Sequence, residues 1–191
     1  SEPLQNGLHP DLVVTGPEGV WNIPEQESTG SYVWRSTVTF DMAAGDYSCA
    51  VSLTDEVGNS TAAPLACPGF VVDSTVPVIS TLSATRTKLS TVANYNTTTL
   101  SFTINEDVSA VDQGARLVVG ESMCPLSFVA NDAGGVDASC TYTLEAGVPD
   151  GPLLVSAYAQ DAAGNSTSAT LNLTADTTAP SLLSTTINQT A

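Results

Sequence analysis

Basic residues are scarce in this sequence. The 191 residues contain four Lys and Arg against twenty Asp and Glu, which gives a formal net charge of −16. Proteins bind nucleic acids and anionic lipids largely through Lys and Arg, because these side chains displace counterions from phosphate groups. The charge balance therefore excludes nucleic acid as a partner. The chain also lacks any run of about 20 apolar residues, which excludes a membrane-spanning helix within this segment.

Histidine is almost absent as well. His9 is the only one, it stands beside Pro10, and no Ser or Cys nucleophile motif surrounds it. The sequence contains no Gly-rich phosphate loop, cofactor motif or carboxylate pair in a catalytic context. These absences predict a protein that is not an enzyme.

The four cysteines carry information about the compartment. One pair is symmetric about Gly58 and the other about Asp132, each in a predicted turn, so the members of a pair would face each other across a hairpin. Spacings of 18 and 16 residues, with a single histidine, fit neither a zinc site nor a redox motif. We predict two disulfides rather than free thiols, each closing its own hairpin, and hence an exported protein. The predicted pairs are Cys49 with Cys67 and Cys124 with Cys140.

The most informative pattern is an internal repeat. DEVGNST at 55–61 returns as DAAGNST at 161–167, and VVDSTVP at 71–77 returns as TADTTAP at 174–180. The turn recurs after 106 residues and the Pro-closed segment after 103. A period of this length exceeds that of a solenoid repeat and matches one small β-domain, so the chain is predicted to contain domains in tandem.

The first copy starts late. When the two copies are aligned, SEPL at 1–4 matches NEDV at 105–108. Residues 78–104 of the second copy therefore have no counterpart in the first copy. We therefore predict that a domain at 1–77 lacks its first strands. These strands would come from sequence upstream or from another chain.

The second copy is predicted to be a complete domain at 78–180. After it, SLLSTTINQTA at 181–191 resembles VISTLSATRTK, which follows Pro77. The last residues are therefore predicted to begin a third repeat, or to serve as a linker or a donated strand.

Strand-forming patterns run through both copies. Hydrophobic residues make up 42% of the chain, which is enough to bury a core. Leu100, Phe102 and Ile104 alternate with Thr and Ser, and a period of two is typical of a half-buried antiparallel strand. The sequence thus predicts an all-β fold with about seven strands in each sandwich domain. The same alternation is found at Tyr32, Trp34, Val38 and Phe40, and further strands are predicted near 12–14, 47–54, 64–72, 117–120, 140–145, 153–160 and 168–175.

These motifs resemble the bacterial immunoglobulin-like repeats of large surface adhesins. In that family a D-x-A-G-N turn lies between the last two strands of a repeat, and D-T-T-A-P ends one repeat and opens the next. The resemblance implies tandem immunoglobulin-like β-sandwich domains. The counterparts in this sequence are 55–59 with 73–77, and 161–165 with 176–180.

Single residues add candidate features. Tyr47 stands two residues before Cys49, which resembles the tyrosine corner of immunoglobulin folds. Trp21 is a candidate aromatic platform for a sugar ring. Five asparagines head N-x-S/T sequons, which matter only in a host that glycosylates secreted chains: Asn59, Asn96, Asn165, Asn172 and Asn188.

The repeated acids predict a calcium site. In a seven-strand sandwich, the loop after the second strand and the loop between the last two strands lie where the chain enters the domain. Their oxygen donors would meet the incoming linker there, and calcium binds six to eight such oxygens in irregular geometry. The family resemblance implies the same, since such repeats use calcium to stiffen their linkers. The predicted ligands are Asp73, Glu106, Asp107, Asp161 and Asn165; Glu2, Asp55 and Asn59 would form a half-site, and Asp176 the linker half of another.

The alternative is an ordinary turn. Asp and Asn accept hydrogen bonds from nearby backbone, Gly adopts positive φ, and acids on loops are commonly solvated. On that interpretation the recurrence of the turn reflects the fold and not a ligand.

The sequence as a whole predicts a non-catalytic, extracellular stalk or fibre segment that acts in adhesion. Its partners would be neighbouring repeats of the same or an identical chain, with a surface receptor or a glycan as a further candidate. An accessory spacer or carbohydrate-binding module of a secreted enzyme is the main alternative. A ligand-binding adhesin tip is another, and an exposed apolar patch on the first domain would favour it.

Overall fold

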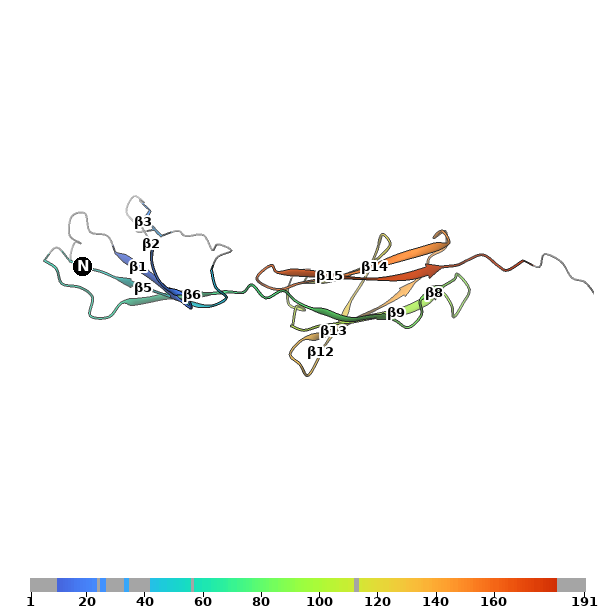
Figure 1. Cartoon of the computed structure of the whole chain (residues 1–191), viewed down its shortest axis with the longest axis horizontal. Coiled ribbons are helices and arrows are strands. Elements are labelled where there is room, and N and C mark those ends of the chain that lie inside the picture. The colour runs from blue at the N-terminus through green and yellow to red at the C-terminus, as the bar shows by residue number, and fades with distance from the viewer. Residues whose placement is uncertain are drawn as a thin grey trace, which may run out of the picture. The chain divides into compact units, whose positions relative to one another are not determined.

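The computed structural model describes residues 10–23, 25–26, 33–34, 42–55, 57–111 and 114–181. The chain divides into two compact units, unit 1 at 1–75 and unit 2 at 76–191 (Figure 1). Every regular element in the described ranges is a β-strand, so the prediction of an all-β protein is confirmed. The described residues form no helix of the length and hydropathy that a membrane span requires.

Unit 1 is built around one four-stranded antiparallel sheet, with the strand order β2-β1-β5-β6. A separate two-stranded sheet pairs β3 with β4. The strands of the larger sheet are β1 (Asp11–Gly16), β2 (Gly19–Ile23), β5 (Gly45–Ser52) and β6 (Leu65–Val72), and the short pair is β3 (Glu25–Gln26) and β4 (Val33–Trp34).

One face of this sheet carries Trp21, Tyr47 and Phe70, which belong to the described part of unit 1. The Tyr47 ring is 2% exposed and lies 5.0 Å from the Phe70 ring in a stacked arrangement and 5.7 Å from the Trp21 ring. The Tyr47 hydroxyl donates to the carbonyl oxygen of Ala43 at 2.9 Å, four residues upstream. This bond has the geometry of a tyrosine corner, which the sequence predicted at this position. Trp21 is half-buried against Tyr47.

The edge strand β6 contains a bulge. Tyr47 pairs with Phe70, but the register shifts before Cys49 pairs with Cys67, and Pro68 and Gly69 fall in the shift. A Cβ atom at Gly69 would lie 2.4 Å from the Tyr47 carbonyl oxygen, so only glycine fits there. Pro68 lacks an N–H, and proline and bulges at an edge disfavour pairing with another strand.

Unit 2 consists of two sheets that pack on one core (Figure 1). A four-stranded sheet has the order β12-β13-β9-β7, and a five-stranded sheet has the order β11-β10-β14-β15-β8. All pairs are antiparallel except β8 with β15, which is parallel. The strands are β7 (Ile79–Ala84), β8 (Lys88–Leu89), β9 (Thr97–Ile104), β10 (Ala115–Val119), β11 (Ser122–Cys124), β12 (Ser127–Ala130), β13 (Val136–Thr143), β14 (Gly151–Gln160) and β15 (Ser166–Ala175).

The core of unit 2 follows the alternation of its strands. Leu100, Phe102 and Ile104 on β9 are at most 2% exposed, as the period of two predicted. The facing sheet contributes side chains such as Leu117 and Val155, both fully buried. Because successive side chains of a strand point to opposite faces, the intervening Thr and Ser residues of β9 lie on the outer face.

Seven of the predicted strands are present in the structure as β1, β5, β6, β10, β13, β14 and β15. They were predicted, in that order, near 12–14, 47–54, 64–72, 117–120, 140–145, 153–160 and 168–175. The strands β2, β3, β7, β8, β11 and β12 were not predicted, because they are short or lack a clear period of two. Tyr32, Val38 and Phe40 lie outside the described residues, as do His9, Asn188 and the segment 182–191, and the side chain of Trp34 is not described either.

Both predicted disulfides are formed. Cys49 and Cys67 stand directly opposite each other on β5 and β6 with their Cα atoms 5.2 Å apart, so this pair closes its own hairpin as predicted. Cys124 and Cys140 are also bonded, with Cα atoms 6.1 Å apart.

The prediction that the second disulfide also closes a hairpin is wrong. Ala130 pairs with Val136 in the β12–β13 hairpin, which is therefore centred one residue beyond Asp132. Cys124 precedes this hairpin and lies on β11 of the five-stranded sheet, whereas Cys140 lies on β13 of the four-stranded sheet. The chain changes sheets between β11 and β12, so the disulfide joins the two sheets of unit 2.

Candidate functional site

The strand registers bring three segments to one end of unit 2. Ile79, the first residue of β7, pairs with Ile104, the last residue of β9. Gln160, the last residue of β14, donates its amide to the carbonyl oxygen of Gly114, just before β10, at 2.7 Å. The incoming chain, the loop after β9 and the turn after β14 therefore share this end, which contains Glu106, Asp107, Asp161 and Asn165.

The turn between β14 and β15 is closed by its own Asp and Asn. The Asp161 carboxylate accepts the Asn165 amide on Oδ1 and the Asn165 side-chain Nδ2 on Oδ2, both at 2.8 Å. The Asp161 amide in turn donates to the Asn165 carbonyl oxygen at 3.0 Å. Gly164 adopts φ +94°, which a residue with a side chain rarely does. Asp161 is 5% exposed, and these bonds satisfy both of its carboxylate oxygens.

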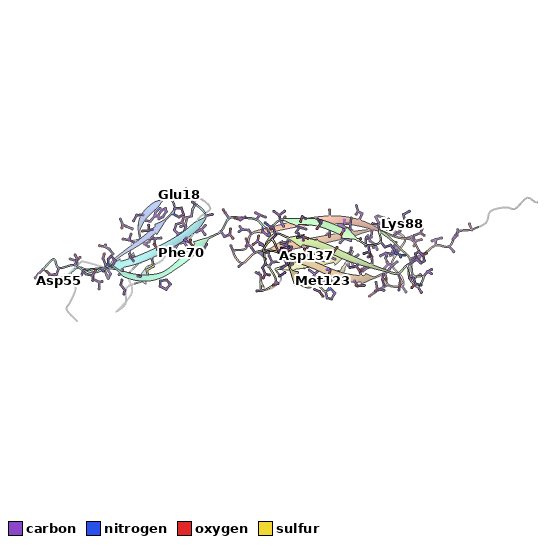
Figure 2. The ribbon with its side chains drawn as sticks, turned by 90° about the horizontal axis from the view of Figure 1, so that it is seen from below. Glu18, Asp55, Phe70, Lys88, Met123 and Asp137 are labelled. Carbon is purple, nitrogen blue, oxygen red and sulfur yellow. A yellow bond between two sulfur atoms is a disulfide. The ribbon has the colours of Figure 1, made fainter. Side chains whose placement is uncertain are left out.

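The first copy of the motif folds in the same way. Asp55 accepts the Asn59 amide on Oδ1 and the Asn59 Nδ2 on Oδ2, both at 2.7 Å, and Gly58 has φ +90°. The Asn59 side chain, followed by its backbone amide, lowers the pKa of Asp55 below its ordinary value. Figure 2 shows Asp55 at the turn between β5 and β6. The repeated motif therefore encodes the same hydrogen-bonded turn in both units.

The remaining predicted ligands lie on loops or linkers. The Asp107 Oδ1 accepts the Ser109 amide at 3.0 Å and the Ser109 hydroxyl at 2.5 Å, and the hydroxyl is the main cause that lowers the pKa of Asp107. Glu106 is half-buried in the same loop. In unit 1 the Asp73 Oδ1 accepts the Thr75 amide at 2.8 Å. Asp176 follows β15, and its amide donates to the Leu89 carbonyl oxygen at 2.8 Å. Glu2 lies outside the described residues.

These contacts are those of turns and loop ends. Within the part of the chain that the structure describes, no three His, Cys, Asp or Glu side chains lie close enough together to hold a metal ion. The donors that surround the Asp161 carboxylate are N–H groups, which satisfy it without a cation. The structure thus assigns Asp161 and Asn165 a role in closing the turn, and calcium binding stays a prediction.

The turn bonds lead to a first prediction. Asp161→Ala should lower the free energy of unfolding of unit 2 by about 1–3 kcal/mol, because it removes the buried carboxylate that accepts two bonds from the half-buried Asn165. Urea unfolding, followed by the amide resonances of β9, would measure the loss. We expect the same loss in a chelator and in millimolar calcium. A loss that appears only with calcium present would instead support the calcium site.

Two residues that the sequence interpretation missed hold the chain at the ends of unit 2. At the end where the chain enters, Asn105 Oδ1 accepts the Val78 amide at 2.7 Å. At the opposite end, Asp150 Oδ1 accepts the Thr177 amide and the Thr177 hydroxyl, both at 2.6 Å, and Asp150 Oδ2 accepts the Thr178 hydroxyl. Comparison of the repeats could not reveal Asp150. It precedes Gly151, whereas the corresponding Gly45 of the first copy is preceded by Ala44.

The donors around Asp150 predict an unusual titration. The Thr177 hydroxyl, then the Thr178 hydroxyl and the Thr177 amide, lower the pKa of Asp150 from 3.8 to about 2. Because the pKa is depressed in the folded state, the bonds are fully present above pH 3.8 and are lost as the pH falls through about 2. The carboxyl carbon resonance of Asp150 should therefore titrate near pH 2. Thr177→Val should raise this midpoint towards 3.8, and a wild-type midpoint already at 3.8 would contradict the bonds.

No protein-family model matches this chain, and a search of the curated proteins found no match either. The resemblance to bacterial immunoglobulin-like repeats therefore rests on the two ordered copies of the turn and of the Pro-closed segment. It remains a prediction.

Proposed function

We propose that this chain is a segment of tandem immunoglobulin-like domains from an exported protein, in which it serves as a non-catalytic stalk or fibre. The strand order of unit 2 supports this proposal. In immunoglobulin domains, one sheet contains strands A, B, E and D and the other contains G, F and C. The order β7-β9-β13-β12 corresponds to the first set, and β15-β14-β10, extended by β11, corresponds to the second.

The observation that carries the proposal is that unit 1 repeats one of these sheets. Its order β2-β1-β5-β6 corresponds strand for strand to β11-β10-β14-β15 of unit 2. The repeated Asp-Asn turn connects the last two strands in each case, with the same pattern of bonds. LVV occurs at 12–14 on β1 and at 117–119 on β10. Two copies of one sheet with the same closing turn favour a modular repeat over a single composite domain.

The disulfides support the exported location. Both pairs are bonded, and neither cysteine pair is left as free thiols. Disulfides persist in oxidising environments such as the cell exterior and are rare where thiols are kept reduced. The excess of acid over basic residues is compatible with a soluble surface that repels its own copies.

A carbohydrate-binding module gains no support from its best candidate residue. A sugar platform needs an aromatic face that is open to solvent, whereas Trp21 is half-buried and its ring packs against Tyr47. The repeated acids also act within their own turns. Neither Trp21 nor the repeated acids therefore support a sugar-binding role.

The decisive experiment combines the sequence of the full gene with a test of whether the protein is exposed on intact cells. The full reading frame should contain further copies of the turn and of the Pro-closed segment at the spacing of about one small β-domain, together with an export signal. Protease treatment of intact producing cells should release peptides of this chain, and alkylation before reduction should modify none of its four cysteines. A catalytic domain in the same gene would favour the accessory module, and four reactive cysteines would overturn export.

A further inference from the structure

The segments that enter and leave unit 2 are each held by one side chain. The outgoing segment begins after Ala175, where β15 ends, and the residues from 176 to 181 are exposed and form no strand. An exposed, non-helical linker is normally flexible. Here the two residues after Asp176 are nevertheless bonded to the body of the domain.

Asp150 makes the outgoing contact. This residue ends the loop between β13 and β14, 27 residues before Thr177 in the sequence. One carboxylate oxygen accepts the amide and the hydroxyl of Thr177, and the other accepts the hydroxyl of Thr178. Bonds to both oxygens fix the orientation of the linker as well as its position, and bonds to a charged acceptor are stronger than neutral ones.

Asn105 makes the incoming contact. Its Oδ1 accepts the Val78 amide at 2.7 Å, and its own amide donates to the Val78 carbonyl oxygen at 3.3 Å. Pro77, the preceding residue, is buried and has its φ restricted by its ring. The chain therefore reaches β7 along a path that is held on both sides of Val78.

We propose that Asn105 and Asp150 are anchor residues that set the direction in which the chain enters and leaves unit 2. The inference rests on the proposed function, because a set direction matters when further domains are attached. Because of these bonds, the rigid backbone of unit 2 extends to Val78 at one end and to Thr178 at the other. The residues that can bend between unit 2 and a following domain are then confined to those after Thr178.

The Asp150 anchor belongs to unit 2 and is not a feature of the repeat. Gly151 opens β14 with φ +139° and Gly45 opens β5 with φ +145°, so the two glycines occupy the same structural position. The preceding residue is Asp150 in unit 2 but Ala44 in unit 1, and the alanine side chain has no hydrogen-bond acceptor. The carboxylate anchor of unit 2 therefore has no side-chain equivalent at the corresponding place in unit 1.

Amide hydrogen exchange in the whole 191-residue chain tests the outgoing anchor. We expect the Thr177 amide to exchange at least roughly tenfold faster in Asp150→Ala than in the wild type, because the bond to a charged acceptor is lost. Heteronuclear relaxation should show rigid backbone as far as Thr178 in the wild type and only as far as Asp176, whose amide is bonded to Leu89, in the variant. The matched control is Asp132→Ala, which removes a carboxylate from the exposed β12–β13 turn and should change neither measurement.

Amides of β9, such as that of Phe102, report whether a variant remains folded. If Asp150→Ala loses the protection of these β9 amides, the test uses Asp150→Asn in its place. Asparagine keeps the size of the side chain and one acceptor oxygen, but it removes the charge and the second acceptor oxygen. Asn105→Ala, with Asn105→Asp as the conservative variant that keeps the acceptor, provides the same test for the Val78 amide. Equal exchange of Thr177 in the wild type and in both Asp150 variants would overturn the anchor.

The exchange rate of the Thr177 amide can be measured separately from the test of the proposed function, so the two can fail separately. If the reading frame contained no further repeats, the stalk would be wrong although Thr177 remained protected. If further repeats were present and Thr177 were unprotected, the stalk would stand and the anchor would be wrong.

Discussion

Replacing both Cys124 and Cys140 with alanine should lower the free energy of unfolding of unit 2 by about 3 kcal/mol. The disulfide closes a loop with a sequence separation of 16 residues, and the loss of this constraint increases the entropy of the unfolded chain. Both sulfurs are buried between the sheets, where alanine adds no unsatisfied polar group. The melting temperature of unit 2 should fall by roughly 12 °C, at about 4 °C for each kcal/mol in a domain of this size.

The two tryptophans make this experiment selective. Trp21 and Trp34 both belong to unit 1, so tryptophan fluorescence follows unit 1 alone, whereas the amides of β9 and β14 follow unit 2. The control is the variant with Cys49→Ala and Cys67→Ala, which should shift the fluorescence transition and leave the β9 amides unchanged. If both double variants shifted the same transition, the assignment of one disulfide to each unit would be wrong.

The second large effect concerns the core of unit 2. Phe102→Ala should lower the free energy of unfolding by about 3–5 kcal/mol, because it leaves a cavity between the two sheets. Phe102 is 2% exposed, and its neighbours on both sheets are as deeply buried, so the site cannot collapse easily. Urea unfolding followed by the amides of β14 would measure the loss in the sheet that faces the substitution.

Thr99→Ala is the matched control on the same strand. Thr99 is exposed on the outer face of β9, and its substitution should change the free energy of unfolding by less than about 0.5 kcal/mol. Equal losses from Phe102→Ala and Thr99→Ala would contradict the assignment of inner and outer faces. A small loss from Phe102→Ala alone would mean that the two sheets do not pack on this side chain.

Local patterns were sufficient for the longest strands and for the repeated Asp-Asn turn. The alternation at Leu100, Phe102 and Ile104 predicted the buried face of β9, because the geometry of a strand places every second side chain on one side. The repeated turn predicted two equivalent hairpins, because Asp, Gly and Asn form their bonds within five residues. The Cys49–Cys67 disulfide was predicted for a similar reason, since its partners lie on adjacent strands joined by one connection.

The candidate site was predicted only in part. The acids after β9 and in the closing turn do lie at one end of unit 2, as the alternation of strand direction required. The sequence left open whether Asp161 binds calcium or bonds its own turn, because it does not reveal whether a carboxylate faces solvent, a cation or its own turn. The chemistry of an acidic residue depends on the donors that surround it, and these are set by the path of the loop.

The amino-acid sequence by itself determined the all-β class, the repeated turn and the buried face of the longest strands, because each depends on contacts between residues close in the chain. Only the tertiary structure decided that Cys124 and Cys140 join two sheets and that Asp150 holds Thr177. The chain changes sheets after Cys124, and Asp150 meets a linker 27 residues further along. Such contacts depend on where strands end in space, and periodicity along the sequence does not specify that position.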